Sequence, residues 1–253
     1  MSTLRICLTR ATNRVDVRWN AALGFGFLKA YTERLMPGAI EFLAAQTLEE
    51  AVSLRPDVLG VSSTSQDFDD ATAMCSGARR AGIPVVVLGG FHITAFPDTL
   101  PVSADLGVLG EGEATFGEVV ALLLRTGALS RRELAGVAGI VYRDESGRLR
   151  KTQPRPVIGD LDDIPIPDHY FGLLAGQQPY MFTSRGCPYR CSFCASSVYW
   201  PNVRFHSAER VLAELESLLR RDPRFPGSVS GTTCLRRTGS GWAGSLTSLK
   251  PKG

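Results

Sequence analysis

Alternation of short apolar strands with amphipathic helices constrains the fold of this chain more than any other feature. Five apolar runs suited to β-strands follow one another in the first half, with helical segments between them. Parallel strands need crossover connections, so this alternation predicts a parallel sheet covered by helices on both faces. The predicted strands are 4–9, 39–44, 58–62, 84–89 and 106–109. We therefore expect an α/β fold with a doubly wound parallel sheet, which binds ligands at the carboxyl ends of its strands.

The predicted helices have apolar faces of the expected period. Thr47 is the predicted N-cap of a short helix, because its hydroxyl can accept a hydrogen bond from a free backbone N–H. In a helix that begins near Asp67, the predicted buried face comprises Phe68, Ala71, Met74, Cys75 and Ala78. In the helix after the fifth strand, it comprises Phe116, Val119, Val120, Leu123 and Leu124.

Small and polar residues follow three of the predicted strands. Since the carboxyl ends of parallel strands meet at one edge, we expect these residues to form one rim. Glycines allow a ligand to approach the backbone, and hydroxyls offer hydrogen bonds. His92, in the second of these loops, is interpreted as a pocket or helix-entry residue. The predicted ligand-binding residues of the rim are Ser62, Ser63, Thr64, Gly89, Gly90, Gly110, Glu111 and Gly112.

Three cysteines within eight residues form the strongest chemical motif. Cys187, Cys191 and Cys194 have the spacing CxxxCxxC, with the aromatic Phe193 before the last thiol. A ferredoxin-type cluster takes four thiolates, whereas three would leave one iron open to a small molecule, as a catalytic zinc site keeps an open position. The motif therefore predicts a reactive metal centre.

The residues around these thiols support metal binding. Gly186 permits backbone geometry that other residues avoid, and Pro188 fixes one φ angle. The positive charges of Arg185 and Arg190 favour the thiolate form that binds metal. A short strand over residues 180–184 is expected to place the cysteines at its carboxyl end.

The other cysteines leave a zinc alternative open. His206 or Cys234 could complete a zinc site with the three thiols, although the spacing is not a paired C-x-x-C pattern. The chain would then be a zinc-binding structural protein. Cys7 and Cys75 lie in apolar segments and are interpreted as small buried hydrophobic residues.

The cysteine motif resembles the cluster loop of the radical S-adenosylmethionine (radical SAM) superfamily. The strand-end loops, together with the run 23–28, resemble the Rossmann-like cobalamin-binding domain that precedes the barrel in one branch of that superfamily. The resemblance implies a 4Fe-4S cluster on the three cysteines, SAM on the open iron beside Phe193, and cobalamin on the rim. The DxHxxG motif that supplies a cobalt-ligating histidine is missing from residues 9–14, which implies cobalt without a protein histidine.

The resemblance also implies a reaction and its partners. The reduced cluster would cleave SAM to a radical that abstracts a substrate hydrogen, with radical methyl transfer, oxidative cyclisation or rearrangement on an unactivated carbon as the outcome. No catalytic residue is expected beyond the cluster. The implied partners are a small-molecule or peptide substrate and an external electron donor of the flavodoxin or ferredoxin type.

Changes in composition suggest four regions. Residues 1–126 are the expected cobalamin-binding domain, 127–178 a β-hairpin and proline-rich linker, 179–226 the start of a radical SAM barrel, and 227–253 an atypical tail. Within the third region, Ser207 is the expected cap of a helix with Glu209, Glu214 and Arg220 on its outer face. The apolar stripe of this helix comprises Val211, Leu212, Leu215, Leu218 and Leu219.

The end of the chain departs from the family pattern. A barrel unit takes about 30 residues, so the residues after 179 are too few for eight units. The tail 227–253 is rich in Gly, Ser and Thr and lacks strand or helix periodicity, which predicts disorder or a displaced reading frame. We therefore expect a fragment with an incomplete barrel, too short to be active. The alternative is a catalytically inactive cobalamin-binding module with a vestigial cluster loop.

Charge and hydropathy exclude two classes of partner. The formal net charge is +3, but the tail 227–253 carries four of the 28 basic residues and no acidic residue, which leaves 24 basic against 25 acidic residues elsewhere. No basic surface for nucleic acid is therefore expected. The sequence has neither a signal-peptide pattern nor an apolar run long enough for a membrane span. A cytoplasmic protein with reduced thiols is expected.

Overall fold

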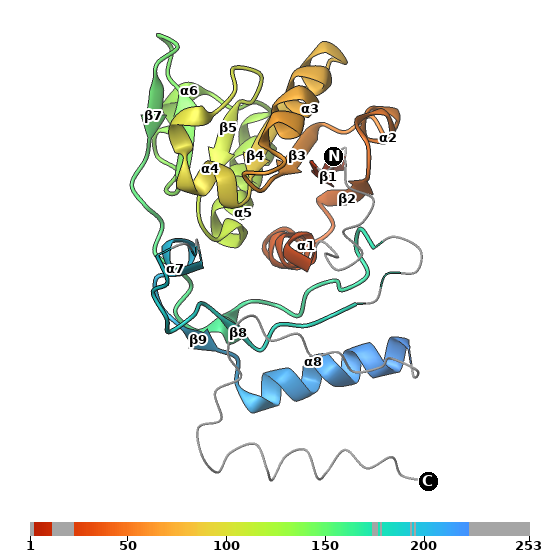
Figure 1. Cartoon of the computed structure of the whole chain (residues 1–253). Coiled ribbons are helices and arrows are strands. Elements are labelled where there is room, and N and C mark those ends of the chain that lie inside the picture. Colours follow the sequence, from red (N-terminus) through yellow and green to blue (C-terminus); the bar gives the residue numbers. More distant parts are fainter. Residues whose placement is uncertain are drawn as a thin grey trace. The chain divides into compact units, whose positions relative to one another are not determined.

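The chain divides into two compact units. The computed structural model describes residues 3–11, 23–173, 177, 179–192, 194 and 196–222. The first unit comprises Met1–Val157 and Pro165–Pro179, and the second comprises Ile158–Ile164 and Tyr180–Gly253 (Figure 1). The predictions for the tail 227–253, including Cys234, lie outside the described residues.

The first unit is built on a seven-stranded sheet with the order β2-β1-β3-β4-β5-β6-β7. β1 to β5 pair in parallel, and β6 and β7 extend the sheet in antiparallel fashion. The predicted parallel sheet is confirmed, and the residue 140–151 hairpin belongs to the same sheet. The strands are β1 (Leu4–Arg10), β2 (Ile40–Ala45), β3 (Val58–Ser62), β4 (Val85–Gly89), β5 (Leu106–Val108), β6 (Ile140–Arg143) and β7 (Leu149–Lys151).

Helices cover both faces of this sheet (Figure 1). Alternate strand residues point to opposite faces, so Ile6 and Leu8 join one core and Cys7 joins the other. Helices α1 and α5 pack against the first core, whereas α2, α3 and α4 pack against the second. The helices are α1 (Leu23–Leu35), α2 (Leu48–Ser53), α3 (Phe68–Arg80), α4 (Phe91–Ala95), α5 (Gly112–Thr126) and α6 (Arg131–Leu134), with the 3₁₀ turn η1 (Pro97–Thr99) after α4. The fold is therefore the expected doubly wound, Rossmann-like α/β fold.

The predicted helix faces are confirmed with one exception. Ala71, Cys75 and Ala78 are fully buried on α3, and the other two predicted residues of that face pack partly buried against the same core. On α5, Leu124 is 37% exposed, while Leu122 is buried. The prediction for Leu124 was wrong, because Leu122 rather than Leu124 belongs to the core cluster that includes Leu134 of α6.

The segment Pro165–Pro179 belongs to the first unit although it follows residues of the second. Asp168 N donates a hydrogen bond of 3.3 Å to Gly26 O of α1, and Lys29 Nζ lies 3.3 Å from an Asp168 carboxylate oxygen. A Cβ atom on Gly26 would collide with the Asp168 carbonyl. Phe171 packs edge-on against Phe42 of β2. We call residues 165–173 of this segment the strap, because they contact both α1 and β2.

The second unit has little regular sheet in its described part. β8 (Ser184–Arg185) pairs with β9 (Arg204–Phe205), and α7 (Ser196–Tyr199), α8 (Ala208–Arg221) and the 3₁₀ turn η2 (Leu161–Asp163) are its helical elements. The predicted strand over 180–184 was wrong in extent, since only Ser184 of that range is in a strand. The partner strand β9 has only two residues. Because a strand extends only as far as its backbone hydrogen bonds, β8 is equally short.

Helix α8 begins as predicted, and every residue of its predicted apolar stripe is buried or half-buried. Ser207 is its N-cap, with its Oγ 3.1 Å from Arg210 N. Val211, Glu214 and Leu218 are buried. The expected outward position of Glu214 was wrong, because an ion pair with Arg210 compensates the burial of its carboxylate. Among the described residues, no helix is both long enough and apolar enough to cross a membrane.

Candidate functional site

The strand order places a topological switch point between β1 and β3. From β1 the chain moves to β2 on one side, and then crosses back to β3 on the other side. In open parallel sheets, ligands bind outside the carboxyl ends of the strands at such a point. The loops after β3, β4 and β5 all leave that edge, because these strands are parallel. The three loops predicted to form one rim are therefore brought to one edge of the sheet.

Hydrogen bonds connect these three loops to one another. Ser63 N donates to Gly89 O at 3.2 Å, which joins the β3 loop to the end of β4. Thr94 of α4 joins the next pair, since its Oγ1 donates to Gly90 O at 2.8 Å and accepts from Gly110 N at 3.0 Å. Thr94 was not among the predicted rim residues, because its role depends on a partner sixteen residues away. The rim is consequently a preorganised structure.

The two glycines at the end of β4 have different roles. Gly90 has φ +100°, and a Cβ atom there would lie 2.5 Å from Ser63 O and 2.8 Å from Ser62 Oγ. A side chain at Gly90 is therefore excluded by the protein itself. A Cβ atom on Gly89, by contrast, would meet no atom within 4 Å. The space beside Gly89 is open to a ligand.

Two buried hydroxyls lie at the switch point. Ser63 is 2% exposed and Thr9, near the end of β1, is 0% exposed. Within the described residues, neither Ser63 Oγ nor Thr9 Oγ1 has a hydrogen-bond partner. Buried polar groups normally have a partner, because an unmade hydrogen bond is costly. A ligand with polar groups at this edge fits both hydroxyls. Thr9 was not among the predicted site residues, since its position in an apolar strand favoured a core role.

The remaining predicted rim residues lie in the loops as expected. Thr64 Oγ1 donates to an Asp67 carboxylate oxygen at 2.8 Å, which stabilises the turn before α3. Glu111 holds the N-cap position of α5 in an extended conformation, without a side-chain capping bond. Gly110 has φ +70°, and Gly112 is the first residue of α5. His92 lies in the short helix α4, as its interpretation as a helix-entry residue implied.

The cysteine loop follows β8 in the second unit. Gly186 has φ +91° and lies against the Asn202 backbone, which confirms the special geometry expected there. Cys187 and Cys194 are partly buried, Cys191 is exposed, and Cys194 N donates to Cys191 O at 3.0 Å. Across the described ranges, no group of three His, Cys, Asp or Glu side chains is close enough to hold a metal ion. Phe193 lies outside the described residues.

The donor set nevertheless has the chemistry that an iron–sulfur cluster requires. None of the three thiols is in a disulfide, and soft thiolate ligands select such clusters. Cys7 and Cys75 differ, because both are fully buried and burial raises their thiol pKa values to about 11 and about 12. These two cysteines are core residues, as predicted. The ligand role of Cys187, Cys191 and Cys194 stays a prediction.

The contacts of His206 do not favour a role as a metal ligand together with the thiols. Its Nδ1 lies 3.0 Å from an Asp162 carboxylate oxygen, and its side chain is 1% exposed. Its backbone N donates to Thr183 O, before the start of β8, whereas Cys187 follows the end of that strand. The geometry does not favour the zinc alternative in which His206 completes the site.

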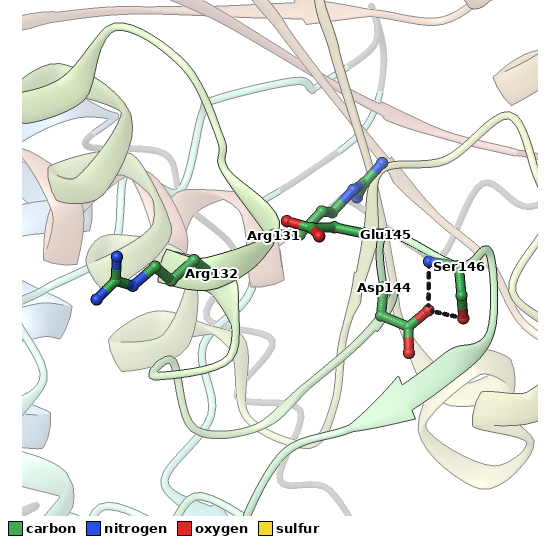
Figure 2. Close-up of a pocket in the computed structure, with 5 residues that line it drawn as sticks. All are labelled: Arg131, Arg132, Asp144, Glu145 and Ser146. Carbon is green, nitrogen blue, oxygen red and sulfur yellow. Dashed lines mark hydrogen bonds between the residues drawn. The ribbon is translucent and has the colours of Figure 1, made fainter.

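A hollow of about 350 Å³ lies at another edge of the first unit. Figure 2 shows it at the turn after β6, where Asp144 Oδ1 accepts hydrogen bonds from Ser146 N at 2.9 Å and Ser146 Oγ at 2.6 Å. β6 runs antiparallel to β5, so its end lies beside Leu106, at the start of β5. The hollow is therefore at the amino edge of the parallel strands, opposite the rim. Its lining residues are Arg131, Arg132, Asp144, Glu145 and Ser146.

Comparison with known proteins agrees with this geometry. Residues 31–120 match the B12 binding domain family. An uncharacterized methyltransferase of Pyrococcus horikoshii is 35% identical over 228 residues, which cover 82% of this chain and 48% of that protein. The anaerobic magnesium-protoporphyrin IX monomethyl ester cyclase of Rubrivivax gelatinosus is 30% identical, with 80% of this chain and 39% of that protein covered. The chain thus spans about half or less of the length of these relatives.

Solved structures share the fold. The cobalamin-dependent SAM radical enzyme OxsB, with aqua-cobalamin and SAM bound, matches with a TM-score of 0.66 at 23% identity over 88% of this chain and 32% of its own. The radical SAM methyltransferase TsrM of Kitasatospora setae, with tryptophan and a SAM analogue bound, matches with a TM-score of 0.64 at 20% identity over 87% of this chain and 46% of its own.

The fold, the linked strand-end loops and the family match define a protein with a B12-binding domain. The curated relatives include the cobalamin-dependent radical SAM methyltransferase TokK of Streptomyces tokunonensis, 30% identical over 72% of this chain and 28% of that protein. Its homologues and structure neighbours include cobalamin-dependent radical SAM enzymes, which confirms the resemblance to the cobalamin-binding-domain branch of the radical SAM superfamily.

Proposed function

We propose that the rim after β3, β4 and β5 binds cobalamin. The observation that carries this proposal is the pair of buried hydroxyls, Ser63 Oγ and Thr9 Oγ1, beside loops already joined by Ser63 and Thr94. A large cofactor with polar side chains would supply partners for the hydroxyls and occupy the open space at Gly89. Serine, threonine and backbone groups would bind and orient the cofactor.

We further propose that cobalt is bound without a protein histidine. The sequence contains three histidines, His92, His169 and His206, and none of them lies in the loop directly after β1. Both ring nitrogens of His92 are within hydrogen-bond distance of hydroxyls, and His169 is 6% exposed. His206 belongs to the second unit, where it is bound to Asp162. The lower base of cobalamin would then be displaced with no imidazole in its place.

The second proposed site is the cysteine loop. Cys187, Cys191 and Cys194 would hold a 4Fe-4S cluster, with SAM on the open iron next to Phe193. When bound, the cofactors supply radical formation from SAM and methyl transfer, oxidative cyclisation or rearrangement. Gly186 sets the direction in which the chain leaves β8, and the exposed residues that follow can close around a cluster. The exposed Arg190 would favour the thiolate form of the ligands.

The partners follow from that chemistry. We propose a small-molecule or peptide substrate and an external one-electron donor of the flavodoxin or ferredoxin type, because SAM cleavage consumes an electron. Thiols outside disulfides at the cysteine loop fit a reducing compartment, so we also propose a cytoplasmic protein.

Cobalamin titration tests the first proposal. The absorption spectrum of added hydroxocobalamin should change on binding to the full chain and saturate. Gly89→Ala should weaken binding without loss of stability, because its methyl group enters only the open space. Gly159→Ala in the second unit, whose added methyl group also meets no atom within 4 Å, is the matched control and should bind as wild type does. A titration without spectral change, or equal binding by the Gly89→Ala and wild-type chains, would contradict the proposal.

Anaerobic reconstitution with iron and sulfide tests the second proposal. The protein should gain a broad visible absorbance that is lost in the Cys187→Ala, Cys191→Ala and Cys194→Ala chains and kept in Cys75→Ala. The alternative is a cobalamin-binding module with a vestigial cluster loop. That alternative predicts normal cobalamin binding, no cluster, and no 5′-deoxyadenosine from SAM with a strong reductant.

A further inference from the structure

His92 is held between two hydroxyls, one of which belongs to the loop after β3. Its Nδ1 lies 3.0 Å from Ser65 Oγ, in the loop after β3, and its Nε2 lies 3.1 Å from Thr99 Oγ1, in the turn η1. The imidazole ring stacks on Phe68 of α3, with ring centroids 3.7 Å apart and planes 22° apart. Phe96 packs against the ring at 5.2 Å. The position and plane of this imidazole are therefore fixed by three different segments of the chain.

The hydrogen bonds of this group have only one consistent direction. Thr99 Oγ1 lies 2.6 Å from Phe96 O, and a carbonyl oxygen can only accept, so the single hydroxyl hydrogen of Thr99 is used there. Thr99 Oγ1 must then accept from His92 Nε2–H. In the neutral ring the other nitrogen, Nδ1, carries no hydrogen and accepts from the Ser65 hydroxyl. Ser65 consequently donates its only hydrogen to His92.

The neutral form of His92 fits its surroundings. Partial burial against Phe68 lowers the pKa of His92 below its ordinary value, and the negative charge of Asp69 only partly opposes this shift. With the ring neutral, Ser65 Oγ is left with lone pairs alone for any further partner. Ser65 is exposed, and it ends the run of hydroxyl residues at the carboxyl end of β3. It therefore offers a ligand at the rim an acceptor that cannot become a donor.

We propose that Ser65 is a specificity residue, which accepts a hydrogen bond from a peripheral carboxamide of the corrin ring, and that His92 is the positioning residue that fixes its hydroxyl. This inference rests on the proposed binding of cobalamin at the rim. The corrin periphery of cobalamin carries primary carboxamides, whose NH₂ groups donate. A corrinoid with a carboxylate in that place presents acceptors only, and repels the lone pairs of Ser65. The site would thus select amidated corrinoids over their acid forms.

The test compares hydroxocobalamin with its monocarboxylic acids, in each of which mild acid hydrolysis has turned one carboxamide into a carboxylate. The full wild-type chain should bind one of these acids about tenfold more weakly than hydroxocobalamin, while the others bind nearly as well. Ser65→Ala should lower affinity for hydroxocobalamin about threefold and bring the ratio for that acid close to one. Ser53→Ala, which removes an exposed hydroxyl on α2, is the matched control and should leave the ratio unchanged.

Two substitutions of His92 separate positioning from packing. His92→Phe keeps a ring for stacking on Phe68 but removes the acceptor for Ser65, so discrimination should be lost. His92→Gln keeps one acceptor and one donor and should restore it. Discrimination that survives in Ser65→Ala, or acids that all bind wild type as tightly as hydroxocobalamin, would overturn the inference alone. A wild-type chain that binds no corrinoid would overturn the proposed function as well.

Discussion

Arg210 and Glu214 form an ion pair whose two side chains are almost entirely buried. Their exposed fractions are 10% and 1%, the N–O distance is 2.5 Å, and Arg210 also donates to Ile164 O. Glu216 and Arg220 have the same spacing on the same helix, but they are 61% and 70% exposed and 3.5 Å apart. The two pairs differ mainly in solvation, which decides the energetic value of an ion pair.

Removal of the two glutamates should therefore have unequal effects. Glu214→Ala leaves the Arg210 guanidinium buried without its carboxylate and should lower the free energy of unfolding by about 3 kcal/mol or more. Glu216→Ala, the matched control, should lower it by less than about 0.5 kcal/mol. Urea unfolding followed by circular dichroism measures both. Equal losses of free energy in the two variants would contradict the burial of the Arg210–Glu214 pair.

Single residues were predictable from sequence where the determining interaction is local. The capping roles of Thr47 and Ser207 depend on a backbone N–H three residues away, and both are confirmed. Ser65 and Glu214 were missed or misplaced. The role proposed for Ser65 depends on His92, twenty-seven residues away, and the burial of Glu214 depends on the segment packed over α8. Sequence periodicity predicts a charged residue on the exposed face of a helix, because it gives no sign of a buried cation that would compensate the carboxylate.

At the scale of elements, the segment Ile158–Ile164 is held by the groups around the start of α8. Asp162 accepts from His206 Nδ1 at 3.0 Å and from Ser207 N at 3.2 Å. Arg204 donates to Ile158 O at one end, and Leu161 and Ile164 are fully buried. Three basic side chains, of Arg204, His206 and Arg210, thus bind a segment that is distant in sequence. This attachment should be sensitive to pH.

The stability of the protein should fall as pH decreases from about 7 to about 5.5. Burial lowers the pKa of His206 below its ordinary value; nearby Arg210 lowers it further, and the bond to Asp162 opposes the shift. The unfolded chain therefore takes up a proton near pH 6.5, where the folded chain does not, and stability is lost below that pH. Asp162, whose own pKa is lowered, titrates at more acidic pH.

The urea midpoint at the two pH values measures this effect. His206→Gln should reduce the difference between the midpoints, and a part should remain because the pKa of His92 is lowered in the same direction. A difference between the midpoints that is equally large in wild type and in His206→Gln would assign the pH dependence to other groups.

At the scale of the molecule, the sheet continues past residue 126. Ile140, Val141 and Tyr142 of β6 are at most 6% exposed and cover the edge of β5. Leu134 and Val137 belong to the same core as α5. A chain that ends after α5 would expose this core and an unpaired strand edge.

A fragment of residues 1–126 should consequently be much less stable than a fragment of residues 1–179. The difference in the free energy of unfolding should be about 3 kcal/mol or more, since several large side chains lose their burial. Urea unfolding of the two fragments measures it, and gel filtration reports aggregation through the exposed edge. Equal stability of the two fragments would support residue 126 as the end of an independently folding domain, which is the boundary expected from composition.

Sequence patterns predicted the sheet, its order of strands and helices, and the rim, because these depend on periods of two and 3.6 residues and on loop chemistry. They did not predict the strap, which binds through single contacts such as Lys29 to Asp168 and Gln46 to Gly172. Nor did they show that Thr94 joins two loops. Contacts of this kind have no period, so only the folded arrangement reveals them.

The chain passes between the two units three times, after Val157, after Ile164 and after Pro179. A recombination event with one crossover in this stretch cannot transfer either unit complete. A crossover after Val157 separates the sheet from its strap, and one after Pro179 separates Ile158–Ile164 from α8. Genes of this family should therefore exchange the two units together, and viable chimaeras should have their junctions outside residues 157–180.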